Sequence, residues 1–127
     1  MTPLDVRRIV HLFAIINSSE PKEEREFVLF NFINEFVDDK ELVHEDMREY
    51  YQYLDEYSKS IQQTQTRTRL NDVKIMLICT ELIKNLTQQE IDKLKEYIKL
   101  FISINHSENN TDEKFFKEFI INLLISE

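Results

Sequence analysis

Glycine is absent from this chain of 127 residues, which has one cysteine, two prolines and no tryptophan. Phosphate-binding loops, dinucleotide-binding turns and nucleophile elbows need a residue that tolerates positive φ or lets the backbone approach a ligand. The enzyme classes built on those motifs are therefore excluded. Tight hairpin turns also favour glycine, so its absence argues against an all-β fold.

Cysteine occurs only as Cys79, which excludes an intrachain disulfide. Its place inside an apolar helical segment predicts a buried structural thiol. The first ten residues, MTPLDVRRIV, carry charges within their apolar stretch and have no small-residue cleavage site, so they do not form a signal peptide. We therefore expect a cytoplasmic protein.

Positive charge is scarce, with 16 Lys and Arg against 24 Asp and Glu and a formal net charge of −8. Nucleic acids and anionic membranes are bound through an excess of Lys and Arg, so we expect neither as a partner. The most apolar stretch, residues 70–86, contains Lys and Glu and is shorter than the ~20 apolar residues of a membrane span. Direct membrane insertion is therefore not expected.

Apolar residues recur at helical spacing along most of the chain, which predicts a single all-α domain over residues 1–127, as a whole protein or a fragment of a longer one. We expect about six helices. Thr2 and Asp5 are placed to cap the first, and Thr87 and Glu90 to cap the fifth. The predicted ranges are 3–17, 21–37, 43–59, 70–86, 88–105 and a last helix after Thr111, with an exposed connection from Ser58 to Thr68.

The helix at residues 70–86 has two apolar stripes, so we predict that it is buried on both sides and lies at the centre of the fold. One stripe contains Val73, Met76, Leu77, Thr80 and Ile83, and the other contains Ile75, Ile78, Cys79, Leu82 and Leu86. In the second helix we expect a buried face made by Phe27, Val28, Phe30, Ile33 and Phe36.

Four tyrosines, Tyr50, Tyr51, Tyr53 and Tyr57, lie close together in the third predicted helix. One interpretation places their rings at the edge of the core with the hydroxyl groups in water. The other makes them a partner-binding surface, where tyrosine is enriched. Both interpretations are open at this point.

An internal repeat links the two ends of the chain. Residues 12–34 align without a gap on residues 100–122, and the shared residues include apolar positions and polar positions of the turn. The identical positions in the first copy are Leu12, Phe13, Ile16, Asn17, Ser19, Glu20, Phe27, Ile33 and Asn34. The alignment predicts two pseudo-repeated helix pairs packed around a central buried helix.

These paired segments, LFAIINSSE with REFVLFNFI and the stretch VKIMLICTELIKNLTQQEIDKLKEYIKLFISIN, resemble the TerB-like helical domain of tellurite-resistance proteins. They are most similar to the TerB-like domain that opens large bacterial ABC-transporter ATPase polypeptides. The resemblance implies a cytosolic N-terminal module, membrane-associated through a parent polypeptide. Its partners would be another protein or the downstream domains of the same polypeptide.

TerB-like domains often hold a metal ion with an acidic cluster at an Asp-Gly turn, whereas this chain has Ser-Glu in both turns. The remaining oxygen ligands for a divalent cation are Glu20, Glu24, Glu108 and Asp112. Alternatively, these acids stabilise the positive ends of helix dipoles. His11 and His106 have no second ligand at a metal-binding spacing, and we expect both at the surface.

We therefore predict a non-catalytic helical interaction or sensory domain without a cofactor. The alternative is a divalent-cation-binding regulatory domain. A third interpretation, an enzyme whose nucleophile and base come from distant segments, has no motif to support it.

Overall fold

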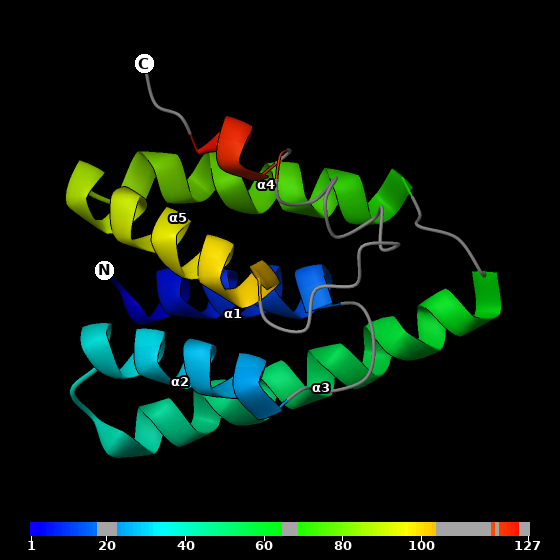
Figure 1. Ribbon diagram of the computed structural model, residues 1–127, viewed down its shortest axis with the longest axis horizontal. Coiled ribbons are helices and arrows are strands. Elements are labelled where there is room, and N and C mark those ends of the chain that lie inside the picture. Colours follow the sequence, from blue (N-terminus) through cyan, green and yellow to red (C-terminus); the bar gives the residue numbers. More distant parts are fainter. Residues whose placement is uncertain (18–22, 65–68, 104–117, 119, 125–127) are drawn as a thin grey trace.

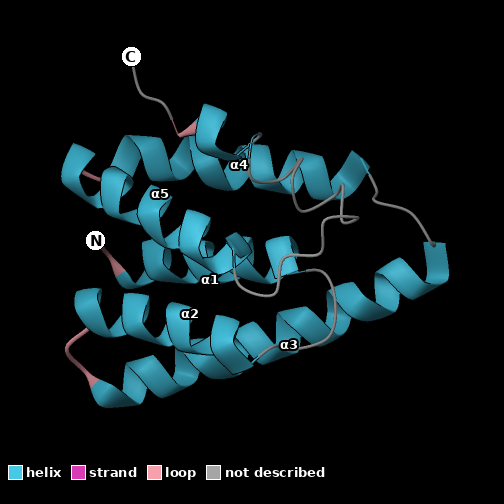
Figure 2. Ribbon diagram, in the orientation of Figure 1, coloured by secondary structure: helices cyan, strands magenta, loops and turns pink. Residues whose placement is uncertain are grey.

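The computed structural model describes residues 1–17, 23–64, 69–103, 118 and 120–124, with side chains described for all of these except 57–64 and 69–72. Five helices have defined bounds: α1 Pro3–Asn17, α2 Glu23–Phe36, α3 Lys40–Thr64, α4 Arg69–Asn85 and α5 Gln88–Ser103. A sixth, short helical segment includes residues 120–123. No strand occurs in the described ranges (Figure 2), so the predicted all-α class is confirmed.

The helices form two layers, with α1 between α3 and α4 in one layer and α2 beside α5 in the other (Figure 1). Helix α1 contacts all four other long helices. The central buried helix is therefore α1, and not the predicted helix at residues 70–86. None of the described helices combines the length and the apolar character that crossing a bilayer requires.

Helix α1 is central because nearly all of its second half is apolar. Eight of its hydrophobic side chains are at most 1% exposed: Val6, Ile9, Val10, Leu12, Phe13, Ala14, Ile15 and Ile16. A helix that is apolar around most of its circumference must be covered by other helices on all of those sides. The two arginines and one histidine of α1 are confined to the narrow sector formed by residues 7, 8 and 11.

Helix α4 is peripheral, so the prediction that it is the central helix was wrong. Its stripe through Ile75, Cys79 and Leu82 is fully buried, whereas Val73, Met76 and Leu77 on the other stripe are exposed. Both stripes are apolar in sequence, and which one faces the core depends on the position of α1. Leu77, expected in the core, is 63% exposed.

The predicted helix caps at Thr2 and Thr87 are both present. The Thr2 backbone amide donates to Asp5 Oδ2 at 3.2 Å and the Asp5 amide donates to Thr2 Oγ1 at 3.2 Å. The same reciprocal pair joins Thr87 and Glu90, at 2.9 and 3.2 Å. Each pair satisfies backbone donors that have no partner inside the helix and so fixes where the helix begins.

Helix α3 is longer than the sequence predicted, because it continues to Thr64. The expected exposed connection from Ser58 to Thr68 is therefore helical over residues 58–64, and residues 65–68 lie outside the described residues. No glycine or proline interrupts this Gln- and Ser-rich stretch, so low apolar content alone did not mark a helix end.

Candidate functional site

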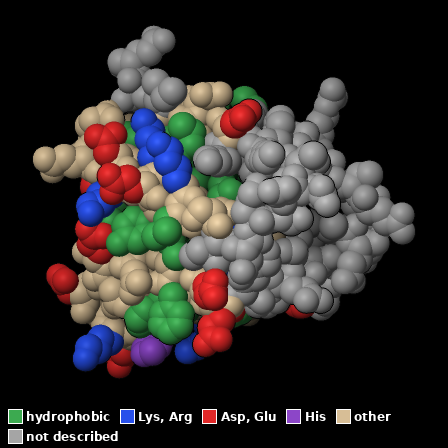
Figure 3. Space-filling view, viewed as in Figure 1, with side chains coloured by type: hydrophobic (Ala, Val, Ile, Leu, Met, Phe, Trp, Pro, Cys, Tyr) green, Lys and Arg blue, Asp and Glu red, His purple; other side chains and the backbone are tan. Residues whose placement is uncertain are grey.

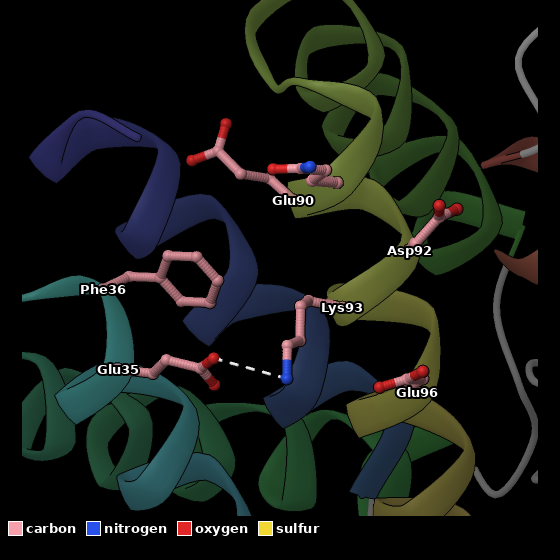
Figure 4. Close-up of a pocket in the computed structure, with 7 residues that line it drawn as sticks. Glu35, Phe36, Glu90, Asp92, Lys93 and Glu96 are labelled. Atoms are coloured by element: carbon pink, nitrogen blue, oxygen red, sulfur yellow. Dashed lines mark ion pairs between the residues drawn. The ribbon is translucent and has the colours of Figure 1, made fainter.

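A surface hollow of about 480 Å³ lies between the end of α2 and the start of α5. Figure 4 shows its acidic lining, in which Glu35, Glu90, Asp92 and Glu96 point in different directions. Lys93 Nζ lies 3.4 Å from Glu35 Oε1, an exposed ion pair of the kind that contributes little. These carboxylates do not converge on one point, so this hollow offers no specific ligand geometry.

A second groove, of about 390 Å³, separates α2 from the first half of α3 and carries more apolar surface. We name it the α2–α3 groove; its lining residues are Glu23, Glu26, Phe27, Phe30, His44, Met47 and Tyr51. Two of its aromatic side chains are largely in solvent, Phe27 at 60% and Tyr51 at 43% exposed. Figure 3 shows that apolar side chains form separate patches on the face carrying α2 and α5, with charged side chains around them.

Helix geometry explains why Phe27 lies at the groove and not in the core. The buried positions of α2 are Arg25, Val28, Leu29, Phe32 and Ile33, which follow each other at helical spacing. Phe27 lies beside that stripe, so its predicted burial was wrong. The signal was present in the sequence, because Leu29 and Phe32 complete a continuous stripe with Val28 and Ile33 whereas Phe27 does not.

The polar rim of the groove is ordered by a hydrogen bond between its two walls. The Tyr51 hydroxyl on α3 donates to Glu26 Oε2 on α2 at 2.9 Å. Burial and this hydrogen bond to a carboxylate raise the pKa of Tyr51. The hydrogen bond therefore links the two walls of the groove through a protonated tyrosine hydroxyl.

The four predicted surface tyrosines do not form one surface. Tyr50 is fully buried, so its assignment to a partner surface was wrong, and burial is the main reason that its pKa is raised. Its hydroxyl has no hydrogen-bond partner in the described part of the chain. Tyr53 is half-buried, with its ring centroid 3.7 Å from that of His11. The side chain of Tyr57 lies outside the described residues, which leaves Tyr51 as the exposed tyrosine of the set.

His11 is half-buried and not at the surface as expected. Its ring packs on Tyr53, and burial lowers the pKa of His11. The imidazole is therefore neutral at pH 7. His106 lies outside the described residues.

Cys79 is fully buried, as predicted, and burial raises the pKa of its thiol to about 12. Reactive cysteines have the opposite property, a lowered pKa in a partly exposed and positively charged environment. Cys79 therefore acts as a small apolar residue in the face that α4 turns to the core.

The predicted metal ligands are only partly described. Glu24 is exposed in the first turn of α2, together with Glu23 and Glu26, where carboxylates interact favourably with the helix dipole. Glu20, Glu108 and Asp112 lie outside the described residues. Within the part of the chain that is described, no three His, Cys, Asp or Glu side chains are grouped to hold a metal ion.

One buried charged residue, Arg25, was not predicted from the sequence. Arg25 is fully buried, and its Nη1 donates to Asn17 Oδ1 at 2.7 Å. Its Nη2 lies 3.4 Å from the Ile102 carbonyl oxygen, and its guanidinium lies 5.1 Å from the centre of the Phe101 ring. Arg25 thus joins the carboxyl ends of α1 and α5, where a positive charge is favoured by both helix dipoles. Its role is structural.

Comparison with known proteins gives no match: no protein-family model, no curated protein and no solved structure is similar to this chain. The resemblance to TerB-like domains therefore remains a prediction.

Proposed function

We propose that the chain is a non-catalytic protein-binding domain and that the α2–α3 groove is its binding surface. The observation that carries the proposal is the exposure of Phe27 next to Tyr51 at the rim of an apolar groove. Aromatic rings at the edge of a concave apolar surface are typical of protein interfaces, because they bury a large area at low cost in side-chain entropy.

The charge around the groove indicates the chemistry of the partner. Glu23 and Glu26 line it, and the whole chain carries a net charge of −8. An amphipathic helix with lysine or arginine on both sides of one large apolar residue matches this surface. The apolar residue would sit on Met47, and the basic residues would meet the two glutamates.

The resemblance to TerB-like domains indicates in what larger protein this binding would take place. In that context the chain is the cytosolic N-terminal module of an ABC-transporter-like ATPase, and the basic segment belongs to a protein partner or to downstream domains of the same polypeptide. The alternative, a divalent-cation-binding regulatory domain, depends on the acidic turns that contain Glu20 and Glu108. No described residue favours it.

The test uses two synthetic amphipathic peptides with the same leucine positions, one with lysines and one with glutamates on the polar face. Fluorescence anisotropy measures the affinity of each peptide for the full chain. We expect the lysine peptide to bind and Phe27→Ala or Tyr51→Ala to weaken its binding at least tenfold. The variants should unfold within ~1 kcal/mol of the wild type, as is usual for surface changes.

Leu100→Ala is the matched control, because Leu100 is a similarly exposed apolar residue on α5, at 51% exposed, and does not line the α2–α3 groove. It should leave peptide affinity unchanged. Equal binding of both peptides, or an equal loss of affinity in Leu100→Ala, would show that the binding is non-specific and would refute the proposal.

A further inference from the structure

A separate cavity of about 230 Å³ lies where the start of α1 meets the α2–α3 turn and the first turns of α3. Its apolar walls include Val6, Val37 and Leu42. It is smaller than the ~300 to 1,000 Å³ of sites for drug-sized ligands, so it fits a small molecule or a single side chain.

One wall of this cavity is the carboxyl group of Asp46, which is only 6% exposed. Among the described residues this carboxyl group has no hydrogen bond or ion pair, and its oxygens are not completely shielded from solvent. Burial is the main reason that its pKa is raised, to about 6. Removing the remaining water from a carboxylate is costly unless a positive partner replaces it, so a cationic ligand would be favoured over a neutral one here.

The nearest positive side chain is directed elsewhere. Arg7 also lines the cavity, but its Nε lies 3.4 Å from Glu49 Oε2, and its side chain is half exposed. Arg7 lowers the pKa of Asp46 at longer range, whereas Glu45 and Glu49 raise it. Asp38 and Asp39 in the turn add two exposed carboxylates to the lining. Met1 also lines the cavity, and its α-amino group forms an ion pair with Glu90 Oε2 at 3.1 Å. The lining residues therefore carry three carboxylates against two positive groups.

We propose that this cavity binds a primary ammonium group carried on a short alkyl chain, with the Asp46 carboxylate as its counter-ion. The apolar walls would enclose the alkyl chain, and Asp38 and Asp39 would attract the cation. A hard metal ion fits less well, because Mg²⁺ and Ca²⁺ need about six or more oxygen ligands. An anion is disfavoured by the three carboxylates.

The ammonium group can come from a free alkylamine or from a lysine side chain of another protein. Either source needs Asp46 in its ionised form, so binding releases a proton and strengthens as the pH rises from 5 to 7. The charged groups around Asp46 in this range are Arg7 on α1, Glu45 and Glu49 on α3, the two aspartates of the turn and the α-amino group of Met1, which is paired with Glu90.

The test is an NMR titration of the full chain with butylammonium and, separately, with its neutral isostere 1-butanol. With butylammonium we expect saturable chemical-shift changes at Val6, Leu42 and Asp46. The alcohol should bind at least tenfold more weakly. Asp46→Asn, which keeps the size of the side chain, should weaken the binding of butylammonium at least tenfold. Asp92→Asn, an exposed acid in the hollow between α2 and α5, should leave the affinity unchanged.

Nα-acetyl-lysine methylamide is the second probe and separates the two sources. Binding tighter than that of butylammonium would assign the site to a lysine side chain, and weaker binding would assign it to a free amine. Equal affinity of the wild type and Asp46→Asn for butylammonium, or equal affinity for the ammonium and the alcohol, would overturn the proposal.

Discussion

The rings of Phe13 and Phe101 meet edge to face with their centroids 4.8 Å apart. These two residues occupy equivalent positions of the internal repeat, 88 residues apart in the chain. A pseudo-two-fold axis brings equivalent residues together where it passes through the core. Phe32 and Ile120, another equivalent pair, are likewise both fully buried. These observations support the repeat, although most of its second copy lies outside the described residues.

Replacing either Phe13 or Phe101 with alanine should lower the free energy of unfolding by ~3 to 5 kcal/mol, because each empties a fully buried aromatic site. Urea denaturation of both single variants and the double variant gives the coupling between the rings. We expect ~0.5 to 1.5 kcal/mol, the usual value for an aromatic pair. Strictly additive losses would show that the two rings do not stabilise each other.

Arg25→Met should destabilise the domain by ~2 to 4 kcal/mol, because it leaves Asn17 Oδ1 and the Ile102 carbonyl oxygen buried without their donor. Arg25→Lys should be nearly as destabilising as Arg25→Met, since an ammonium group cannot reach both acceptors and also lie over Phe101. Thermal unfolding followed by circular dichroism measures both. In some proteins a buried charge can be replaced by an apolar residue without loss of stability. If Arg25→Met kept the wild-type melting temperature, the predicted stabilising role of Arg25 would be contradicted.

Leu82→Ala should cost ~2 to 5 kcal/mol and Leu77→Ala less than ~1 kcal/mol, because only Leu82 faces the core. The pair is a matched comparison, since both are leucines in the same helix. Equal losses in chemical denaturation would mean that the exposed stripe of α4 is covered in solution.

Asp46→Asn should stabilise the domain at pH 8. The pKa of Asp46 is about 6 in the folded protein, against an ordinary value of 3.8. Folding therefore favours the protonated carboxyl group. The stability gained from this protonation is complete below pH ~4, the pKa in the unfolded chain, and is lost as the pH rises through 6, the pKa in the folded protein. Asparagine avoids that loss and should gain ~1 to 2 kcal/mol at pH 8.

Unfolding measured at pH 4, 6 and 8 should show the difference between Asp46→Asn and the wild type growing with pH. A difference that is constant over this range would mean that the Asp46 carboxyl group keeps an ordinary pKa in the folded protein.

Local signals predicted much of this fold. The starts of α1 and α5 follow from the cap residues Thr2 and Thr87, whose hydrogen bonds involve only neighbours in sequence. The buried face of α5 follows directly from its sequence pattern, because its apolar residues form a single stripe: Ile91, Leu94, Ile98, Phe101 and Ile102. Where a helix has one apolar stripe, its orientation needs no knowledge of its neighbours.

The sequence-based predictions that were wrong share one physical cause, which is their dependence on how the helices pack. Helix α4 has two apolar stripes, and only the position of α1 determines that Leu82 is buried and Leu77 exposed. The candidate groove depends in the same way on tertiary structure, because Phe27 on α2 and Tyr51 on α3 become neighbours only when these helices pack. Sequence pattern predicted Tyr51 as a surface residue but could not separate it from the buried Tyr50 next to it.

The buried Arg25 also bears on the order of events in folding. Its bond to Ile102 spans 77 residues, whereas its bond to Asn17 spans 8. A contact of long sequence separation requires closure of a long loop before it gains any energy, which slows folding. The guanidinium therefore loses its hydration fully only when α5 docks on the N-terminal helices. We therefore expect the two ends of the chain to fold and unfold as one cooperative unit.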